Sequence, residues 1–441
     1  MSVDAIIGRL LLNELSDGPI LAIFAASQQL VCSFISGSQT GSAVTHRPLE
    51  GFRVVELGTL IAAPFATRML ADFGAEVIKV ESLNGGDPLR NWRMMHGDTS
   101  LWWYLQSRNK KSLGVDLKSL DGQAVVRRLL RDADVLVENF RPGTLERWGL
   151  GWDELHAANP ALTMVRISGY GQTGPYAGRP GFGSVAEAIG GIRHTTGEKT
   201  GVPARTGISL GDSLASLHAV IGALLSIVNV KCQGRPGQIV DVALYESVFN
   251  LMESSVPEYD LFNHVRERSS GALPGICPSN TYSSKDGRYI VIAGNGDSIY
   301  RRLMKAIGRP DLASHPAYQS NAGRVAACEE IDGAIEAWTS KRDLHDALAQ
   351  LEAAEVPASS IYSVKDIMED PHYQARGMLL DGVLPDGTRV KFPGVVPKLN
   401  DTPGSVEWLG PKIGEHTCEV LAGIGYDAGE IDALKARGVI Q

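Results

Sequence analysis

A chain of 441 residues exceeds the size at which one hydrophobic core usually stops growing, so we expect two domains. Its hydrophobic share of 44% and charged share of 21% are ordinary for a globular protein, whereas a formal net charge of −8 argues against a nucleic-acid-binding protein. The five cysteines form no Cys-x-x-Cys pair, so we expect core cysteines in a reducing compartment and neither a disulfide framework nor a zinc site.

The first 47 residues differ in composition from the rest of the chain. Pro19–Ile35 is apolar enough to resemble a signal or membrane segment, but Gln28 and Gln29 interrupt it. The stretch before it carries no net positive charge, which a signal peptide would need. We therefore treat residues 1–47 as an N-terminal extension of undetermined role and expect no membrane partner.

From residue 51 onward, strands alternate with helices. Short apolar runs predict strands, and apolar residues at steps of three and four predict helices. The expected strands are 53–57, 75–80, 133–140 and 162–168, and the expected helices are 62–73 and 120–131. This alternation predicts an α/β fold with substantial parallel pairing, in which ligands bind beyond the carboxyl ends of the strands. A dinucleotide site is not supported, because Gly58 is followed by no second glycine of a Gly-x-Gly-x-x-Gly motif.

The clearest predicted helix follows Gly211 and ends before Gly234, with Asp212 at its N-terminus. Beyond residue 268 the strands become shorter and the helices more charged, with a strand at 289–293 and helices at 298–307 and 331–352. We therefore expect a large domain over 48–245, a linker over 246–267, a small domain over 268–375 and a return to the large domain over 376–441.

Asp212 has two compatible interpretations. Aspartate is a favoured helix cap, and the same position would stabilise an anionic nucleophile and leave N–H groups for an oxyanion. A rival nucleophile is Ser209, because Gly207–Gly211 matches the Gly-x-Ser-x-Gly elbow of α/β-hydrolases. That elbow needs an apolar strand before the serine, and Pro203–Gly207 does not read as one.

Charge and loop patterns add weaker signals. Residues 90–147 contain eleven basic against seven acidic residues, which fits either a solvated face or a site for a phosphorylated ligand. Gly169–Pro175 follows a predicted strand and is either a tight turn or a ligand-lining loop. The histidines are scattered and no P-loop occurs, so we expect no metal site.

Taken together, these segments resemble the class III CoA-transferase family, which also contains carnitine CoA-transferase and α-methylacyl-CoA racemase. The resemblance runs from Leu49 to the C-terminus, and the ordered set of motifs is more specific than any one of them. The matching segments are Leu49–Gly58, Ala71–Glu81, Gly86–Pro88, Arg108–Ser112, Asp134–Gly143, Gly169–Pro175, Asp370-Pro371, Arg376-Gly377 and Gly414–Thr417.

The resemblance implies an interlocked, ring-like homodimer whose subunits each have a Rossmann-like large domain and a smaller α+β domain. It places the catalytic aspartate at Asp212, which also argues against Ser209. Coenzyme A would enter as a substrate moiety, and no tightly bound cofactor is implied. Cationic residues among the implied contacts fit the phosphates of coenzyme A. The implied coenzyme A contacts are Leu60, Ile61, Ala62, Lys110, Lys111, Asn139, Phe140 and Arg147.

Within this family the sequence favours acyl transfer over racemisation. The racemase branch has a histidine in a Gly-His-Asp motif, whereas this chain has Gly178–Gly183 at that place, without histidine. A lone aspartate suffices for transfer through an aspartyl anhydride and an aspartyl-CoA thioester, whereas proton exchange needs an acid–base partner. The alternatives are an α-methylacyl-CoA racemase and a non-catalytic protein that binds coenzyme A.

The substrate remains open at the level of sequence. Ile61 and Phe182-Gly183 depart from the oxalate-using members, and Ser82-Leu83 replaces an arginine that often follows the second strand. The chain looks closer to the succinyl-CoA:dicarboxylate members, such as the succinate–glutarate transferase. Arg193, His194 and Arg205 are either surface charges or ligands for a distal carboxylate. We expect carboxylic acid substrates and a cytoplasmic location, or the mitochondrial matrix if the source is eukaryotic.

Overall fold

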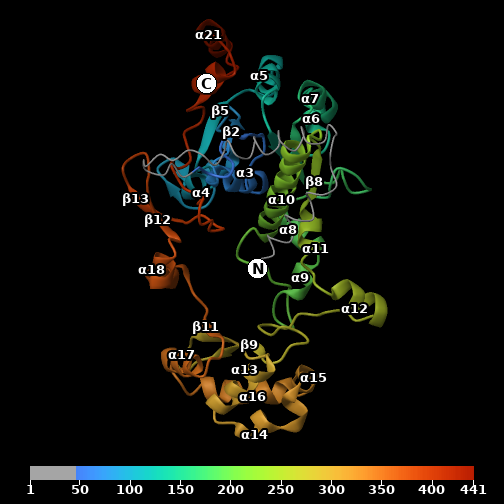
Figure 1. The fold of residues 1–441 in the computed structure, drawn as a ribbon, viewed down its shortest axis with the longest axis vertical. Helices are drawn as coiled ribbons and strands as arrows, with labels where there is room; N and C mark the ends of the chain where they lie inside the picture. Colours follow the sequence, from blue (N-terminus) through green and yellow to red (C-terminus); the bar gives the residue numbers. More distant parts are fainter. Residues whose placement is uncertain (1–45) are drawn as a thin grey trace, which may run out of the picture. The chain divides into compact units, whose positions relative to one another are not determined.

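A parallel six-stranded sheet forms the centre of the computed structural model, which describes residues 46–441 (Figure 1). The predicted extension lies almost wholly outside the described residues. The strand order is β5-β2-β1-β6-β7-β8, and every neighbouring pair is parallel. In chain order this is 3-2-1-4-5-6, the order of a Rossmann fold, so the prediction of a parallel α/β sheet is confirmed. The strands are β1 (Arg53–Glu56), β2 (Glu76–Glu81), β5 (Lys110–Gly114), β6 (Val135–Glu138), β7 (Thr163–Ser168) and β8 (Ile239–Ala243).

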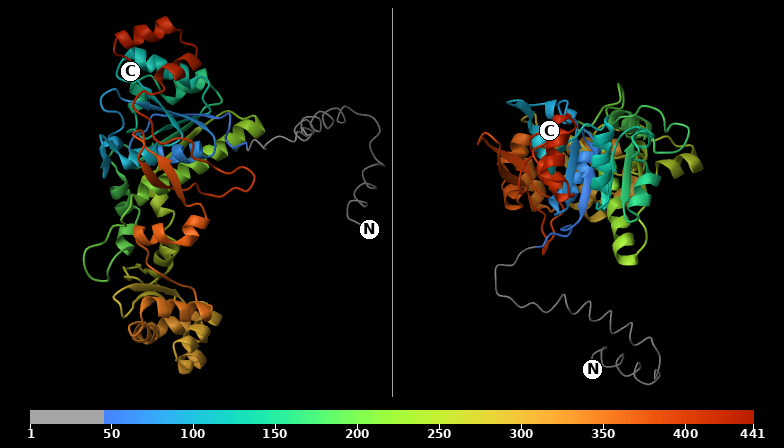
Figure 2. Two further views of the ribbon diagram at one scale, coloured as in Figure 1. Left: turned by 90° about the vertical axis from the view of Figure 1, so that its left-hand side faces the viewer. Right: turned by 90° about the horizontal axis from the view of Figure 1, so that it is seen from above.

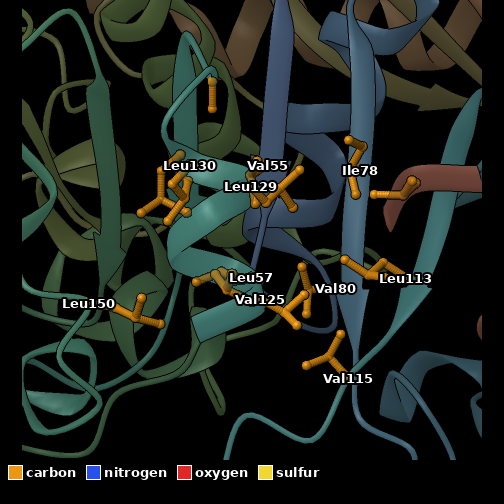
Figure 3. Close-up of a cluster of buried hydrophobic side chains, with 14 of the residues drawn as sticks. Val55, Leu57, Ile78, Val80, Leu113, Val115, Val125, Leu129, Leu130 and Leu150 are labelled. Atoms are coloured by element: carbon orange, nitrogen blue, oxygen red, sulfur yellow. The ribbon is translucent and has the colours of Figure 1, made fainter. Parts of the chain in front are cut away.

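Two hydrophobic clusters cover the two faces of this sheet, because successive residues of a strand point to opposite sides. Val54 packs with α3 (Ala62–Asp72) and α10 (Leu210–Gln233), whereas its neighbour Val55 packs with α5 (Leu120–Leu130). Figure 3 shows the cluster on the α5 side of the sheet, where Val55, Leu57 and Ile78 meet leucines and valines of α5.

The C-terminal segment completes the cluster around α5. Residues of α20 (Thr417–Gly423) and α21 (Ala428–Ala436) belong to that cluster, and Ile440 forms a β-bridge with Val115. The indole Nε1 of Trp408 donates to the carbonyl of Lys110 at 3.0 Å. The last residues of the chain therefore pack against the body that holds the parallel sheet (Figure 2).

A second, separate core surrounds an antiparallel sheet of order β11-β10-β9. The predicted strand at 289–293 is present as β10 (Tyr289–Ala293), flanked by β9 (Ser279–Ser283) and β11 (Ala358–Ser360). The single helix expected over 331–352 is wrong, because α16 (Cys328–Thr339) and α17 (Leu344–Ala353) are separate helices. The buried residues pass from Thr339 to Leu344 in a step of five, which breaks helical spacing.

Shorter elements connect these two bodies and flank them. Between the strands of the large sheet lie η1 (Pro88–Asn91), β3 (Met95–His96), β4 (Thr99–Ser100), α4 (Leu101–Gln106), α6 (Thr144–Arg147), α7 (Trp152–Ala158), α8 (Gly183–Ile189) and α9 (Ile192–Thr195). After β8 come α11 (Leu244–Phe249), α12 (Ser255–Phe262), α13 (Asp297–Ala306), α14 (Pro310–Ser314), η2 (Pro316–Gln319), α15 (Asn321–Ala326), α18 (Val364–Glu369), α19 (Pro371–Ala375), β12 (Leu379–Val383) and β13 (Arg389–Pro393).

Helix α10 positions the candidate catalytic residue and is apolar on more than one side. Its buried face, which includes Leu214, Ala219 and Ala223, packs against the sheet, and Gly234 ends the helix at φ 62°. Its other side leaves Ile221 54% and Leu225 65% exposed. By length and composition α10 would also pass as a membrane span, a test that core helices of soluble proteins pass as well.

Candidate active site

The loops after β1 and β6 meet where neighbouring connections of the sheet diverge, the place where Rossmann folds bind ligands. The Asn139 side chain holds the two loops together at this crevice. Its Oδ1 accepts from the Thr59 N–H at 2.8 Å, and its Nδ2 donates to the Thr59 carbonyl at 2.9 Å. A Cβ on Gly58 would lie 2.2 Å from that of Ala63, so only glycine allows this approach.

The predicted contact residues Leu60, Ile61 and Ala62 lie beside Asn139 in this crevice. Leu60 has a φ of 66°, and its N–H donates to both oxygens of Asp87 at 3.1 and 3.2 Å. Ile61 occupies the N-cap position of α3, and the Ala62 carbonyl accepts from the Ser216 hydroxyl at 2.7 Å. The structure therefore brings four of the predicted residues together at one edge of the sheet.

Lys110 lies elsewhere, inside the protein. Its fully buried ammonium donates to Glu56 at 2.8 Å and to the Pro64 carbonyl at 2.7 Å, while Lys79 contacts the other Glu56 oxygen at 2.6 Å. Burial lowers the pKa of Lys110 to about 8 against the opposing effect of Glu56. Burial alone would raise the pKa of Glu56, but the two lysines lower it to about 2. This placement supports a structural role for Lys110 and not a direct phosphate contact.

The remaining predicted contacts are closer to the surface. Lys111 is a quarter exposed and pairs with Glu76 at 2.9 Å and Glu419 at 2.8 Å. The Phe140 ring packs edge-on against Trp148 at 5.3 Å. Arg147 is exposed on α6, and within residues 46–441 its guanidinium donates only to Thr144, at 2.9 Å, which leaves its other guanidinium N–H groups to a ligand.

Asp212 lies inside the first turn of α10, and Ser209 occupies the N-cap position. The interpretation of Asp212 as the helix cap is therefore wrong by three residues. No strand precedes Ser209 between residues 197 and 208, so the hydrolase elbow is also wrong. The Asp212 carboxylate rests on backbone of α8, because a Cβ on Gly183 would lie 2.1 Å from Oδ2.

A buried acidic residue, Glu187, lies behind Asp212. Glu187 is 1% exposed and accepts from Arg193 Nε at 3.3 Å, from Arg205 Nε at 3.2 Å and from the Gly211 N–H at 3.4 Å. Burial and the negative charge of Glu187 raise the pKa of Asp212 to about 6, although Arg205 lowers it in part. The carboxylate is thus less stabilised as an anion than an exposed aspartate.

Ser216 connects Asp212 to the crevice. Its hydroxyl lies 2.7 Å from the Asp212 carbonyl, one helical turn earlier, and 2.7 Å from the Ala62 carbonyl. The candidate nucleophile and the predicted coenzyme A loop are therefore neighbours.

The loop Gly169–Pro175 supports this arrangement. A Cβ on Gly169 would lie 2.8 Å from the Cα of Gly181, two residues before Gly183. The Tyr170 ring packs between Tyr176 and Tyr245, with ring centroids at 5.8 and 6.1 Å. The loop packs behind the backbone on which Asp212 rests.

Sequence reasoning missed Glu187. A glutamate within Gly183–Ile189 carries no motif, and its burial depends on helices far apart in the chain. The only available signal was the pair of arginines, Arg193 and Arg205, which the structure shows bound to it. His194 is separate and faces Glu267 at 3.2 Å.

Two other features lie away from Asp212. A cavity of about 1210 Å³ between the C-terminal segment and the β12–β13 hairpin is lined by none of the predicted site residues. Cys277, Cys328 and Asp332 have ligand-type atoms within 4.8 Å of one another, and Asp332 is held by Tyr282 at 2.7 Å. The prediction of no metal site stays a prediction.

The expectation of core cysteines holds for Cys277, which is buried, but is wrong for Cys232 and Cys418, which are exposed.

Comparison with known proteins places this geometry in one family. The family model described as CoA-transferase family III matches residues 49–417. The chain is 46% identical to the succinyl-CoA–D-citramalate CoA-transferase of Chloroflexus aurantiacus, over 89% of this chain and 98% of that protein. It is 35% identical to the succinate–glutarate CoA-transferase of Agrobacterium fabrum, over 85% and 95%.

A solved structure, a CAIB/BAIF family protein from Brucella suis, is similar with a TM-score of 0.75 and 32% identity, covering 86% of this chain and 100% of that one. Together with the match over most of the chain, these relatives identify the protein as an enzyme that transfers coenzyme A. The chain belongs to CoA-transferase family III.

Proposed function

We propose that this enzyme moves coenzyme A from succinyl-CoA to a small dicarboxylic acid. The support comes from relatives that are 35–46% identical, whose names give succinyl-CoA or succinate together with citramalate, malate or glutarate. All of these acids carry two carboxylates. Coenzyme A is then the transferred group, and the enzyme keeps no cofactor of its own.

The observation that carries the mechanism is the position of Asp212. Its carboxylate lies in the first turn of a 24-residue helix, against the Cβ-free surface of Gly183 and one turn from the hydrogen bond to Ala62. The N-terminus of a helix stabilises negative charge, and flanking N–H groups stabilise an oxyanion. A raised pKa makes the carboxylate a better nucleophile while leaving it mostly ionised at neutral pH.

The proposed reaction is covalent catalysis. The Asp212 carboxylate attacks the thioester carbon of succinyl-CoA, giving a mixed anhydride and the CoA thiolate. The thiolate attacks the aspartyl carbonyl, giving aspartyl-CoA and free succinate. The acceptor carboxylate then attacks the aspartyl carbonyl of aspartyl-CoA, giving a second mixed anhydride and the CoA thiolate. The thiolate attacks the acceptor's acyl carbon, giving the acceptor's CoA thioester and releasing the Asp212 carboxylate. Bonds and charges balance without a net proton.

Replacing the nucleophile tests this mechanism. In Asp212→Ala, transfer from succinyl-CoA should fall by about 10³-fold or more, because no other group replaces the covalent intermediate. In the wild type incubated with succinyl-CoA, hydroxylamine should convert aspartyl-CoA into a hydroxamate on the Asp212 peptide, detectable by mass spectrometry. The matched control is Ser213→Ala, which lies in the same turn and should remain active.

Three results would contradict the proposal. Transfer at the wild-type rate by Asp212→Ala would exclude the aspartyl intermediate. Exchange of the α-proton of a 2-methylacyl-CoA, without acyl transfer, would favour the racemase. Binding of coenzyme A with neither activity would favour a non-catalytic protein.

We also propose that the enzyme works as a homodimer, as the resemblance to the family implies, and that it is located in the cytoplasm, or in the mitochondrial matrix if the source is eukaryotic. Support for the homodimer comes from the exposed apolar side of α10 and from α12, where Leu261 and Phe262 are each 72% exposed. Such surfaces mark protein interfaces more often than free surface.

A further inference from the structure

We propose that Arg205 binds the remote carboxylate of the dicarboxylic acid substrate and so selects dicarboxylates over monocarboxylates. This inference rests on the proposed function and assigns to one side chain the choice between two classes of acid.

The first observation is how Arg205 is held. Its Nε and Nη2 contact Glu187 at 3.2 and 3.4 Å, and no other hydrogen bond from its guanidinium occurs among residues 46–441. Glu187 is 1% exposed, whereas the Arg205 side chain is 44% exposed. The buried carboxylate therefore fixes one edge of the guanidinium and leaves Nη1 and the other edge to a ligand from solvent.

The second observation is where Arg205 lies. Glu187, which holds Arg205, also accepts from the N–H of Gly211 at 3.4 Å, and Gly211 directly precedes Asp212. Consistent with this placement, Arg205 lowers the pKa of Asp212 against burial and Glu187. Arg193 also contacts Glu187 through Nε at 3.3 Å but does not act on Asp212 in this way, and its side chain is 27% exposed. Of the two arginines that contact Glu187, Arg205 is thus the one that lowers the pKa of Asp212, and its side chain is the more exposed to solvent.

Charge explains why a cation is needed there. The acceptor acid attacks aspartyl-CoA, in which Asp212 carries no charge, so the carboxylate that it meets nearby is Glu187. A dicarboxylate brings a second negative charge to this place, and a monocarboxylate does not. A planar guanidinium forms two parallel hydrogen bonds to a carboxylate, which neither a lysine nor a neutral side chain reproduces. The acid's first carboxylate can then react while the second is bound at Arg205.

His194, the third candidate from the sequence, does not fit this role. Its imidazole faces Glu267 at 3.2 Å, so a nearby carboxylate already occupies that side of the ring.

The test compares two acceptors of equal length, glutarate and pentanoate, with succinyl-CoA as the common donor. In a ping-pong reaction, kcat/KM for the acceptor reports only the half-reaction in which the acceptor takes part. Arg205→Gln should lower kcat/KM for glutarate by about tenfold or more, the expected effect of losing a charge-assisted hydrogen bond, and leave that for pentanoate within about twofold. Arg205→Lys should lose part of the preference.

Arg193→Gln is the matched control, because it removes the other arginine from the same glutamate. It should keep the wild-type ratio of the two kcat/KM values. Folding of each variant is checked by circular dichroism, and if Arg205→Gln does not fold, Arg205→Lys provides the comparison.

The inference is overturned if Arg205→Gln lowers both kcat/KM values equally, if it changes neither, or if Arg193→Gln loses the same preference. A wild type that uses pentanoate as well as glutarate overturns the inference alone. A wild type that transfers coenzyme A to neither acid overturns the proposed function as well.

Discussion

Asp212 combines two properties that oppose each other at the scale of a single residue. Burial and Glu187 make its anion costly, and the proposed mechanism needs that anion. Because the folded-state pKa of about 6 lies above the value in an unfolded chain, the ionised side chain destabilises the fold. The penalty is absent at a pH below the unfolded pKa, where both states are protonated, and is fully present above about pH 6.

Asp212→Asn should therefore stabilise the protein at pH 8 and have little effect near pH 4. The expected gain at pH 8 is at most about 3 kcal/mol, since each pKa unit corresponds to about 1.4 kcal/mol. Urea unfolding at the two pH values measures it. As a control, Asp121→Asn removes one side of an exposed ion pair with Arg437 and should have a small effect at both values. A loss of stability at pH 8 would contradict the raised pKa.

Glu187 should set the acid limb of the activity profile. In Glu187→Gln the negative charge next to Asp212 is lost, so the pKa of Asp212 falls and activity persists to lower pH. Profiles of kcat between pH 4 and pH 8 measure the shift. Glu146→Gln, which removes a partner of Arg166 on another element, is the control and should leave the limb in place. An unmoved limb in Glu187→Gln would show that Glu187 does not act on Asp212.

At the scale of elements, a buried ion-pair network joins β1, β2, β5 and α3. Glu56 accepts from Lys79 and Lys110, and Lys79 also contacts Asp87 at 2.8 Å, which in turn holds the Leu60 N–H. This network thus connects strand β1 to the loop that carries Leu60 and forms part of the crevice.

Lys110→Met should lower the free energy of unfolding by about 3–5 kcal/mol, because it leaves Glu56 with one buried partner fewer. Chemical denaturation measures this loss. Lys111→Met removes a partly exposed pair and should cost about 1 kcal/mol or less. If Lys110→Met is as stable as the wild type and its KM for succinyl-CoA rises, Lys110 contacts coenzyme A after all.

At the scale of the whole molecule, the proposed homodimer predicts that the exposed apolar side of α10 contacts the partner subunit. Leu225→Glu introduces a charge into that side and should shift the protein from dimer to monomer, which light scattering after gel filtration measures. The control is Leu120→Glu on α5, where the leucine is 79% exposed and lies outside α10 and α12. A wild type that is already monomeric would contradict the homodimer.

Much of the fold was predictable because its signals are local. The strands at 53–57, 75–80 and 162–168 and the helix before Gly234 appear within one or two residues of their expected bounds. The single helix expected over 331–352 was wrong because its two halves share helical composition, and only the five-residue step between the buried positions Thr339 and Leu344 separates them.

The candidate site was predictable only in part. Asn139 and the loop Leu60–Ala62 follow strands that are adjacent in a Rossmann order, so their meeting is a consequence of topology. The burial of Lys110 was not predictable, because the partner that holds it inside, Glu56, lies 54 residues earlier in the chain. Its contact with coenzyme A, which the resemblance implies, stays a prediction.

The sequence by itself determined the alternation of strands and helices, the family and the choice of Asp212, since these depend on short-range patterns and ordered motifs. Only the tertiary structure decided which charges face each other. The pairing of Glu187 with Arg205, and of Glu56 with Lys110, depends on distances across the fold, and burial turns those distances into large electrostatic effects.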